Sequence, residues 1–125
     1  MTLAAWCILV AAALPYLWVL LAKSVPNYDN RTPREGLERA QGWRKRANWA
    51  QLNAFEAFPP FAAGVIVAQM AHAPQGRVDL LAASFIGLRI LHGVFYVADK
   101  AQLRSLVWFL GLACVVTLFV TAAGY

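Results

Sequence analysis

The sequence predicts an all-α integral membrane protein, a bundle of four transmembrane helices forming a single domain over residues 1–125. Composition is the first reason. Hydrophobic residues make up 61% of the chain and charged residues only 14%, whereas a soluble domain carries about a quarter charged residues. Spacing is the second, because the apolar residues gather in runs of the ~20 residues that a helix needs to cross a bilayer.

The first apolar run, about residues 2–22, contains no charged residue. A secretory signal peptide is the alternative for this segment. However, no basic stretch precedes the run, and Lys23 follows it, where the flank of a membrane anchor is expected. We therefore expect a span. Pro15 lies inside it and predicts a kink and not a break, because neighbouring helices can satisfy the freed carbonyl.

Three further runs follow, at about residues 47–73, 80–98 and 105–124. The second span carries one charge, Glu56, and its first half is polar on one side. The third span carries only Arg89, and the fourth carries no charged residue. Each run is long enough to cross a bilayer as a helix, so we expect four spans.

Basic residues between the spans predict the orientation. The first loop, residues 23–46, and the connection before the fourth span hold nine of them: Lys23, Arg31, Arg34, Arg39, Arg44, Lys45, Arg46, Lys100 and Arg104. The second connection holds only Arg77. Because basic residues concentrate on the cytoplasmic side, we expect the 23–46 loop to be cytoplasmic and both termini to face outward. Residues from Pro33 to about Arg46 are also consistent with a short interfacial helix.

The net charge of +5 does not indicate nucleic-acid binding, because the basic residues flank hydrophobic spans and are better explained as topology signals. The two cysteines, Cys7 and Cys114, lie inside apolar runs. Neither a disulfide framework nor a metal site is expected from them.

Ionisable side chains within spans are costly, so they are paired or functional by default. Glu56 lies nine residues into the second span and Arg89 lies nine residues from the end of the third. At ~1.5 Å per residue both are ~14 Å from the cytoplasmic face. Matched depth and opposite charge predict an ion pair between them, either as a structural link or as part of a site.

Other polar residues share these two helix faces. Arg89, His92 and Tyr96 follow i, i+3, i+7 spacing on the third span. Trp49, Asn53, Glu56 and Pro60 do the same on the second, and Arg104 and Ser105 open the fourth. Each residue alone has a simpler explanation: a packed histidine, an interfacial tyrosine, a flanking arginine. Together they predict a polar cleft that opens to the cytoplasm and suits an anionic ligand.

The second span carries a recognisable pattern. Residues 50–61, AQLNAFEAFPPF, match AQxNxxExFPxF, which resembles the signature of the MAPEG family, the membrane-associated proteins in eicosanoid and glutathione metabolism. The family includes microsomal glutathione transferases, leukotriene C4 synthase and prostaglandin E synthase. The later residues Arg89, His92, Tyr96 and Arg104, with an aromatic at Trp108, extend the resemblance over the whole chain.

The resemblance implies a homotrimer that binds glutathione between subunits near the cytoplasmic face. Its function would be a glutathione-dependent transferase or peroxidase acting on hydrophobic electrophiles that arrive from the bilayer, as in detoxification. By position, the residues that contact glutathione would be Asn53, Glu56, Arg89, His92 and Tyr96. Arg104 and Ser105 would lie beside the thiol and serve catalysis, with no metal.

Two alternatives remain open. Enzymes of this family often carry arginine where this chain has Trp49 or Leu52, and one branch of the family binds lipid without chemistry. A lipid-binding scaffold is therefore the second hypothesis. A small multidrug exporter is the third, but such exporters use a carboxylate in the first span, which is uncharged here. The small size and lack of a targeting peptide favour a bacterial inner membrane.

Overall fold

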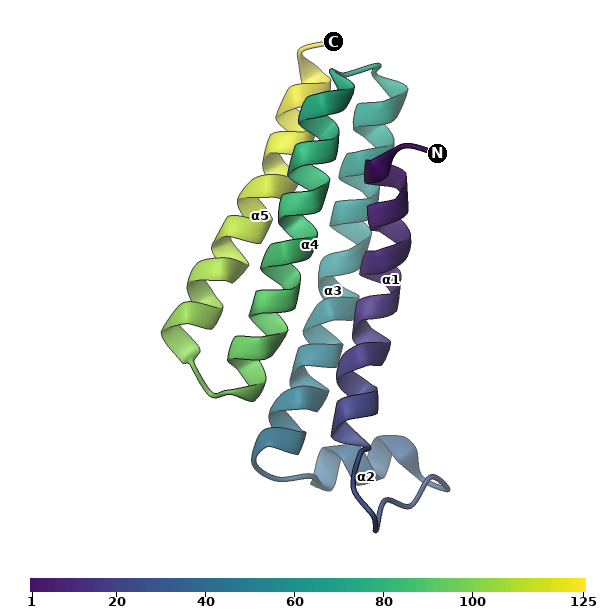
Figure 1. The fold of residues 1–125 in the computed structure, drawn as a ribbon, viewed down its shortest axis with the longest axis vertical. Coiled ribbons are helices and arrows are strands. Elements are labelled where there is room, and N and C mark those ends of the chain that lie inside the picture. The colour runs from purple at the N-terminus through teal and green to yellow at the C-terminus, as the bar shows by residue number, and fades with distance from the viewer.

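The computed structural model describes residues 1–125 and is entirely helical. Its five helices are α1 (Leu3–Ala22), α2 (Pro33–Arg39), α3 (Trp43–Met70), α4 (Gln75–Val97) and α5 (Ala101–Ala123). The four long helices run side by side, with both chain termini at one end and α2 at the other (Figure 1). The predicted all-α class is confirmed.

Three of the four long helices begin earlier than the apolar runs predict. They start at Trp43, Gln75 and Ala101, where the sequence analysis expected 47, 80 and 105. Polar residues such as arginine, lysine and glutamine form helices readily, so hydrophobicity marks where a span can lie and not where its helix starts. The helix expected from Pro33 to about Arg46 stops at Arg39, where Ala40 turns to an extended conformation with ψ 149°. Gly42 follows with a positive φ of 62°, which favours glycine, and α3 begins after it.

Three helices, α1, α4 and α5, are long and apolar enough to cross a membrane. The predicted second span, α3, does not reach the same hydropathy although it has 28 residues. Its first half carries polar side chains, among them Asn48, Gln51, Asn53 and Glu56. The fourth crossing therefore remains a prediction.

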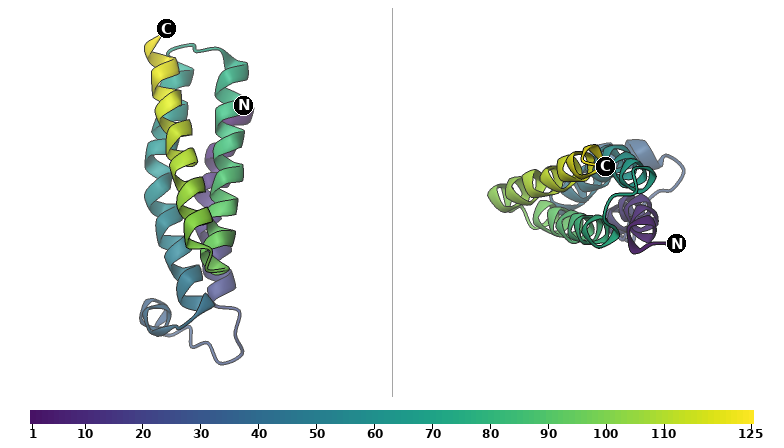
Figure 2. Two further views of the ribbon diagram at one scale, coloured as in Figure 1. Left: turned by 90° about the vertical axis from the view of Figure 1, so that its left-hand side faces the viewer. Right: turned by 90° about the horizontal axis from the view of Figure 1, so that it is seen from above.

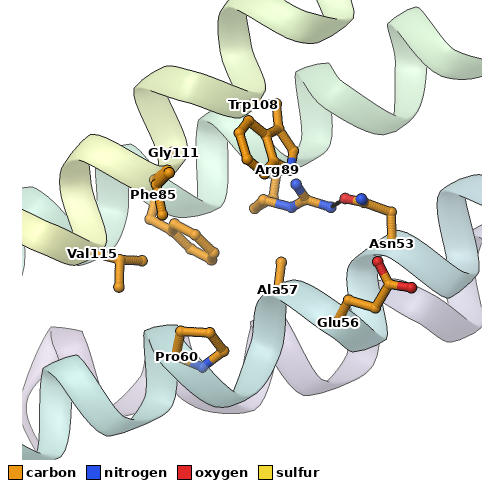
Figure 3. Close-up of a pocket in the computed structure, with 10 residues that line it drawn as sticks. Asn53, Glu56, Ala57, Pro60, Phe85, Arg89, Trp108, Gly111 and Val115 are labelled. Carbon is orange, nitrogen blue, oxygen red and sulfur yellow. Dashed lines mark hydrogen bonds between the residues drawn. The ribbon is translucent and has the colours of Figure 1, made fainter.

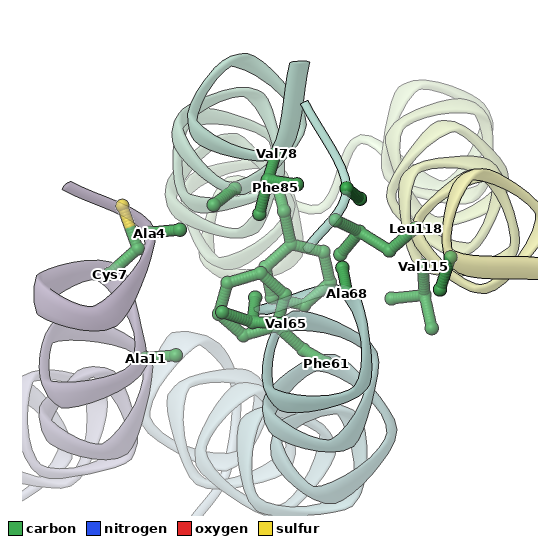
Figure 4. Packing of buried hydrophobic residues seen from close by; sticks show 13 residues of the cluster. Ala4, Cys7, Ala11, Phe61, Val65, Ala68, Val78, Phe85, Val115 and Leu118 are labelled. Carbon is green, nitrogen blue, oxygen red and sulfur yellow. The ribbon is translucent and has the colours of Figure 1, made fainter. Parts of the chain in front are cut away.

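The core occupies the half of the bundle near the termini. Phe61 of α3 stacks on Phe85 of α4, with ring centroids 4.0 Å apart and planes at 5°. Val65, Val78 and Leu118 are fully buried around this pair (Figure 4). The contributions of α1 are small side chains, Ala4, Cys7 and Ala11, which let this helix lie close to α3 and α4.

At the α2 end the helix pairs separate. The ends of α4 and α5 diverge there from those of α1 and α3 (Figures 1 and 2). Two arginines at the start of α3 hold this end together. Arg44 Nε donates to the carbonyl of Ala22 (2.9 Å) and Arg46 Nε donates to that of Val97 (3.1 Å). These are otherwise unpaired carbonyls at the ends of α1 and α4, so both arginines have a structural role besides any effect on topology.

Asp79 of α4 stabilises the start of α1. Its Oδ1 accepts the backbone N–H of Ala4 (2.9 Å) and the side-chain amide of Gln75 (2.7 Å). The Ala4 N–H lies in the first turn of α1, where it has no partner within the helix and where a negative charge is favourable. We expect Asp79→Ala to lower the free energy of unfolding by about 1–2 kcal/mol. Melting in detergent would measure this, and Asp79→Asn, which keeps an acceptor oxygen, should recover part of the loss. Equal melting of the alanine variant and the parent would contradict the assigned role.

Candidate functional site

Three adjoining cavities lie between α3, α4 and α5, in the half of the bundle nearer α2. An inner cavity of about 190 Å³ reaches from Glu56 and Arg89 towards Val115 (Figure 3). A mouth cavity of about 230 Å³ lies beside Arg104, and an outer cavity of about 320 Å³ lies beside Trp49. Asn53 lines all three. Because they share lining residues, the three cavities are neighbours, and together they are called the cleft below.

The cleft gathers every residue that the sequence analysis selected. The inner cavity is lined by Asn53, Glu56 and Arg89, and the mouth cavity by His92, Tyr96, Arg104 and Ser105. The predicted arrangement, two helix faces meeting at matched depth beside the start of the last helix, is thus present in the structure. What these residues bind is a separate question.

The partner of Arg89 is Asn53 and not Glu56. The buried Arg89 side chain, 5% exposed, donates from Nη2 to Asn53 Oδ1 at 2.6 Å and so links α4 to α3. The predicted Glu56–Arg89 ion pair is wrong, because the one ion pair in the structure joins Glu35 and Arg39 within α2. Glu56 and Arg89 line the same cavity, as their matched depths predict, but the guanidinium hydrogen-bonds Asn53, one turn before Glu56. The exposed Glu56 carboxylate has no protein partner.

The Glu56 result gives a prediction about stability. Because Glu56 is exposed and forms no ion pair, we expect Glu56→Gln to change the free energy of unfolding by no more than about 0.5 kcal/mol. Asn53→Leu, which removes the acceptor of a buried guanidinium, should instead cost about 1–3 kcal/mol. Thermal melting of both variants in the same detergent would compare them. A larger loss for Glu56→Gln than for Asn53→Leu would show that the carboxylate compensates Arg89 after all.

His92 is buried in the wall of the mouth cavity. It is 3% exposed, and its Nδ1 has no hydrogen-bond partner within the protein. The edge-to-face contact with the Tyr96 ring, 5.6 Å between centroids, fixes the imidazole. A buried polar atom without a partner is unfavourable, so His92 leaves an unsatisfied nitrogen within the wall of the mouth cavity.

Tyr96 also orients Arg104. The guanidinium of Arg104 lies 4.5 Å from the centroid of the Tyr96 ring, the geometry of a cation–π interaction. The Trp49 ring packs near the same tyrosine, with ring centroids 6.3 Å apart. A residue of α4 therefore positions Arg104, which itself lies in the first turn of α5. Ser105 lines the same cavity.

The apolar end of the inner cavity was not expected from the sequence, apart from Pro60 on the polar face of the second span. Its walls are Ala57, Pro60, Phe85, Gly111, Leu112 and Val115, with Trp108 where the inner and mouth cavities meet. A signal for part of this wall was present. Arg104, Trp108, Gly111 and Val115 follow i, i+4, i+7, i+11 spacing, which places them on one face of a helix.

The cleft can therefore hold a molecule with two different ends. Arg89, Arg104 and Glu56 supply two positive charges and one negative charge, and Asn53 and His92 supply neutral hydrogen-bonding groups. The remaining wall is apolar. This combination suits a zwitterionic, net anionic molecule that meets an apolar one.

Comparison with known proteins agrees with this pattern. The model of the MAPEG family matches residues 3–124, essentially the whole chain. Among curated proteins, none matches the chain significantly.

Proposed function

The chain belongs to the MAPEG family, and from this membership we propose that it is a membrane-bound, glutathione-dependent transferase or peroxidase acting on hydrophobic electrophiles. Family membership supports a role connected with glutathione or eicosanoid metabolism. The observation that carries the more specific proposal is the cleft, in which Arg89, Arg104 and Glu56 converge beside an apolar wall.

The groups of the cleft complement those of glutathione, which has two carboxylates, one ammonium and a thiol. Glu56, which has no partner in the protein, would accept the ammonium. Arg89, held by Asn53, would donate to a carboxylate, a geometry that a guanidinium can satisfy with two parallel hydrogen bonds. Asn53, His92 and Tyr96 would hydrogen-bond the rest of the peptide.

Arg104 and Ser105 would act on the sulfur. A free thiol ionises near pH 8.5, and a neighbouring guanidinium favours the thiolate. The Ser105 hydroxyl would donate a hydrogen bond to the same atom. Bound glutathione would supply the nucleophile, so that a carbon–sulfur bond forms as the leaving group departs with its electron pair. The cation–π contact with Tyr96 would keep Arg104 in position for this role.

The assembly and location are parts of the same proposal. We infer a homotrimer in a bacterial inner membrane, with the 23–46 loop cytoplasmic and both termini outside. The basic residues of this loop lie at the same end of the bundle as the α4–α5 connection with Lys100 (Figure 1), and the termini lie at the other end. The cleft would then open towards cytoplasmic glutathione.

A lipid-binding scaffold with the same fold is the second candidate. Trp49 and Leu52, where the family resemblance led us to consider arginine, line the outer cavity and make it less basic. Such a protein would use the cleft for a lipid and would not need to ionise a thiol. Glutathione binding separates the two functions.

Calorimetry with glutathione is the direct test, using the purified protein in mild detergent. We expect saturable binding by the parent and at least about a tenfold loss of affinity in Arg89→Ala, because a charge-assisted contact contributes about 1.5–3 kcal/mol. Arg77→Ala is the matched control, since Arg77 is exposed near the other end of the bundle. If Arg89→Ala unfolds, Glu56→Gln, an exposed position, replaces it. A folded parent that binds no glutathione would overturn the proposal in favour of the scaffold.

A further inference from the structure

The proposed function assigns no contact with glutathione to the apolar end of the inner cavity. Phe85 and Val115 are buried at its back, and Gly111 of α5 lies beside Phe85 (Figure 3). Pro60 of α3 and Leu112 of α5 are both exposed at its edge. The cavity therefore opens between α3 and α5, onto the outer surface of the bundle.

We propose that this apolar end binds the apolar group of the electrophile, that it accepts a group about the size of one aromatic ring, and that Gly111 determines this limit. This inference rests on the proposed function only in taking the bound molecule to be the electrophile. The binding of an apolar ring at this place does not depend on glutathione and can be tested alone.

The volume of the cavity limits the size of its occupant. The inner cavity measures about 190 Å³, whereas an apolar cavity of ~150 Å³ is enough to bind benzene. Pockets for drug-sized ligands measure ~300–1,000 Å³. One ring with a short substituent therefore fits inside the cavity, whereas a long acyl chain would have to extend out of it.

Gly111 is the residue that leaves this space open. A Cβ at position 111 would lie 3.8 Å from Cδ2 and Cε2 of Phe85 and 4.0 Å from Cδ of Arg89, which are ordinary contact distances. Helix packing therefore does not require glycine here, unlike at Gly64, where a Cβ would come within 3.3 Å of Leu118 and Phe119. Glycine in a helix is also less stable than alanine by about 1 kcal/mol. A side chain at position 111 would instead fill part of the inner cavity.

The position of the cavity connects a bound ring to the reacting groups. A ring against Phe85 and Val115 would point its substituent towards Arg89 and Trp108. Trp108 also lines the mouth cavity that contains Arg104. An electrophilic substituent would thus lie on the side of the cavity that faces the proposed thiol site.

The test uses chlorobenzene, an unreactive single-ring probe, and follows the melting temperature of the protein in detergent as the probe is titrated. A ligand that binds only the folded state raises this temperature. We expect a saturable rise for the parent, at least about tenfold weaker apparent affinity for Gly111→Leu, and a smaller loss for Gly111→Ala. Gly87→Leu is the control, because position 87 has open space around it and lies outside the cavity.

Glutathione calorimetry on the same variants separates this inference from the proposed function. Retained glutathione binding together with lost chlorobenzene binding in Gly111→Leu would support the ring site. Unchanged chlorobenzene affinity in folded Gly111→Leu, or in Gly111→Ala if the leucine variant fails to fold, would overturn it whatever the glutathione result. A parent that binds chlorobenzene with the expected Gly111 dependence but not glutathione would contradict the proposed function alone.

Discussion

Replacing Arg104 with alanine is expected to lower kcat by about 10²–10³, the usual effect of losing one preorganised group that stabilises a developing anion. Glutathione affinity should change only a few-fold, because Arg89, Glu56 and Asn53 remain. The reason is geometric: Arg104 lies over the Tyr96 ring in the mouth cavity, beside Ser105 and apart from the inner cavity that contains Arg89. Steady-state turnover of a reactive aryl halide, with calorimetry on the same preparations, would measure both quantities.

The pH dependence makes the Arg104 prediction specific. If Arg104 acts on the thiol as proposed, the guanidinium would lower the thiol pKa, and the thiolate would already be abundant at pH 7. Without it, the thiol titrates near its free pKa of ~8.5, so the fraction of thiolate, and with it the rate, should rise through that pH. The ratio of parent to variant activity should therefore fall as pH increases from about 6.5 to 9. A ratio independent of pH would mean that Arg104 does not act on the thiol.

Two further variants serve as controls for Arg104. Lys100→Ala removes a positive charge from the same end of the bundle, at an exposed residue outside the cleft, and should leave kcat unchanged. Arg104→Lys keeps a charge but loses the planar guanidinium that stacks on Tyr96. It should retain part of the activity. Equal losses in Lys100→Ala and Arg104→Ala would indicate a general electrostatic effect and not a local one.

The sequence was informative about the fold because lipid-compatible helices leave a strong compositional signal. The apolar runs located the long helices, and Gly42 and the polar residues of the first loop explain the limits of that signal. The short helix ends where Ala40 becomes extended, and α3 begins after Gly42 with its positive φ; hydrophobicity registers neither backbone conformation. Similarly, Arg44 and Arg46 extend α3 because arginine is a good helix former, although both lie outside the apolar run.

For the site, periodicity predicted which residues would meet but not which atoms would pair. Helical spacing brought Asn53, Glu56 and Arg89 to one cleft, and the structure agrees. The expected partner was wrong because Asn53 and Glu56 share a helix face one turn apart, and counting residues along a helix does not specify toward which of the two the long Arg89 side chain extends. The space beside Gly111 was not predictable either, since a cavity depends on side chains from three helices.

Gly93→Ala is expected to be the most destabilising single-methyl change in the chain. Gly93 of α4 faces Trp18 of α1, and a Cβ built there would overlap the indole ring, with Cη2 at 2.6 Å. Overpacking usually costs about 1–3 kcal/mol and occasionally more. We expect the upper end of this range, because Trp18 is only 6% exposed and is packed against Ala50 and Ala54, so the ring cannot simply move aside.

Melting in detergent would measure the loss, with Gly87→Ala as the matched control. Position 87 lies on the same helix and has nothing within 4 Å of its Cβ, so that change should be neutral or stabilising by up to about 1 kcal/mol. Adding Trp18→Leu to Gly93→Ala should cost less than the sum of the two single changes, because it removes the clash. Additive losses would show that the two residues do not interact.

The steric clash caused by Gly93→Ala should also affect the geometry of the candidate site. Tyr96 packs against the group formed by Trp18, Ala50 and Ala54, and its ring makes the cation–π contact with Arg104. Displacing Trp18 would therefore disturb the support of Arg104 from a position that lines none of the three cavities. We expect Gly93→Ala, assayed below its melting temperature, to lose turnover more than glutathione affinity. Restoration of both stability and turnover by Trp18→Leu would identify this single contact between α1 and α4 as the cause.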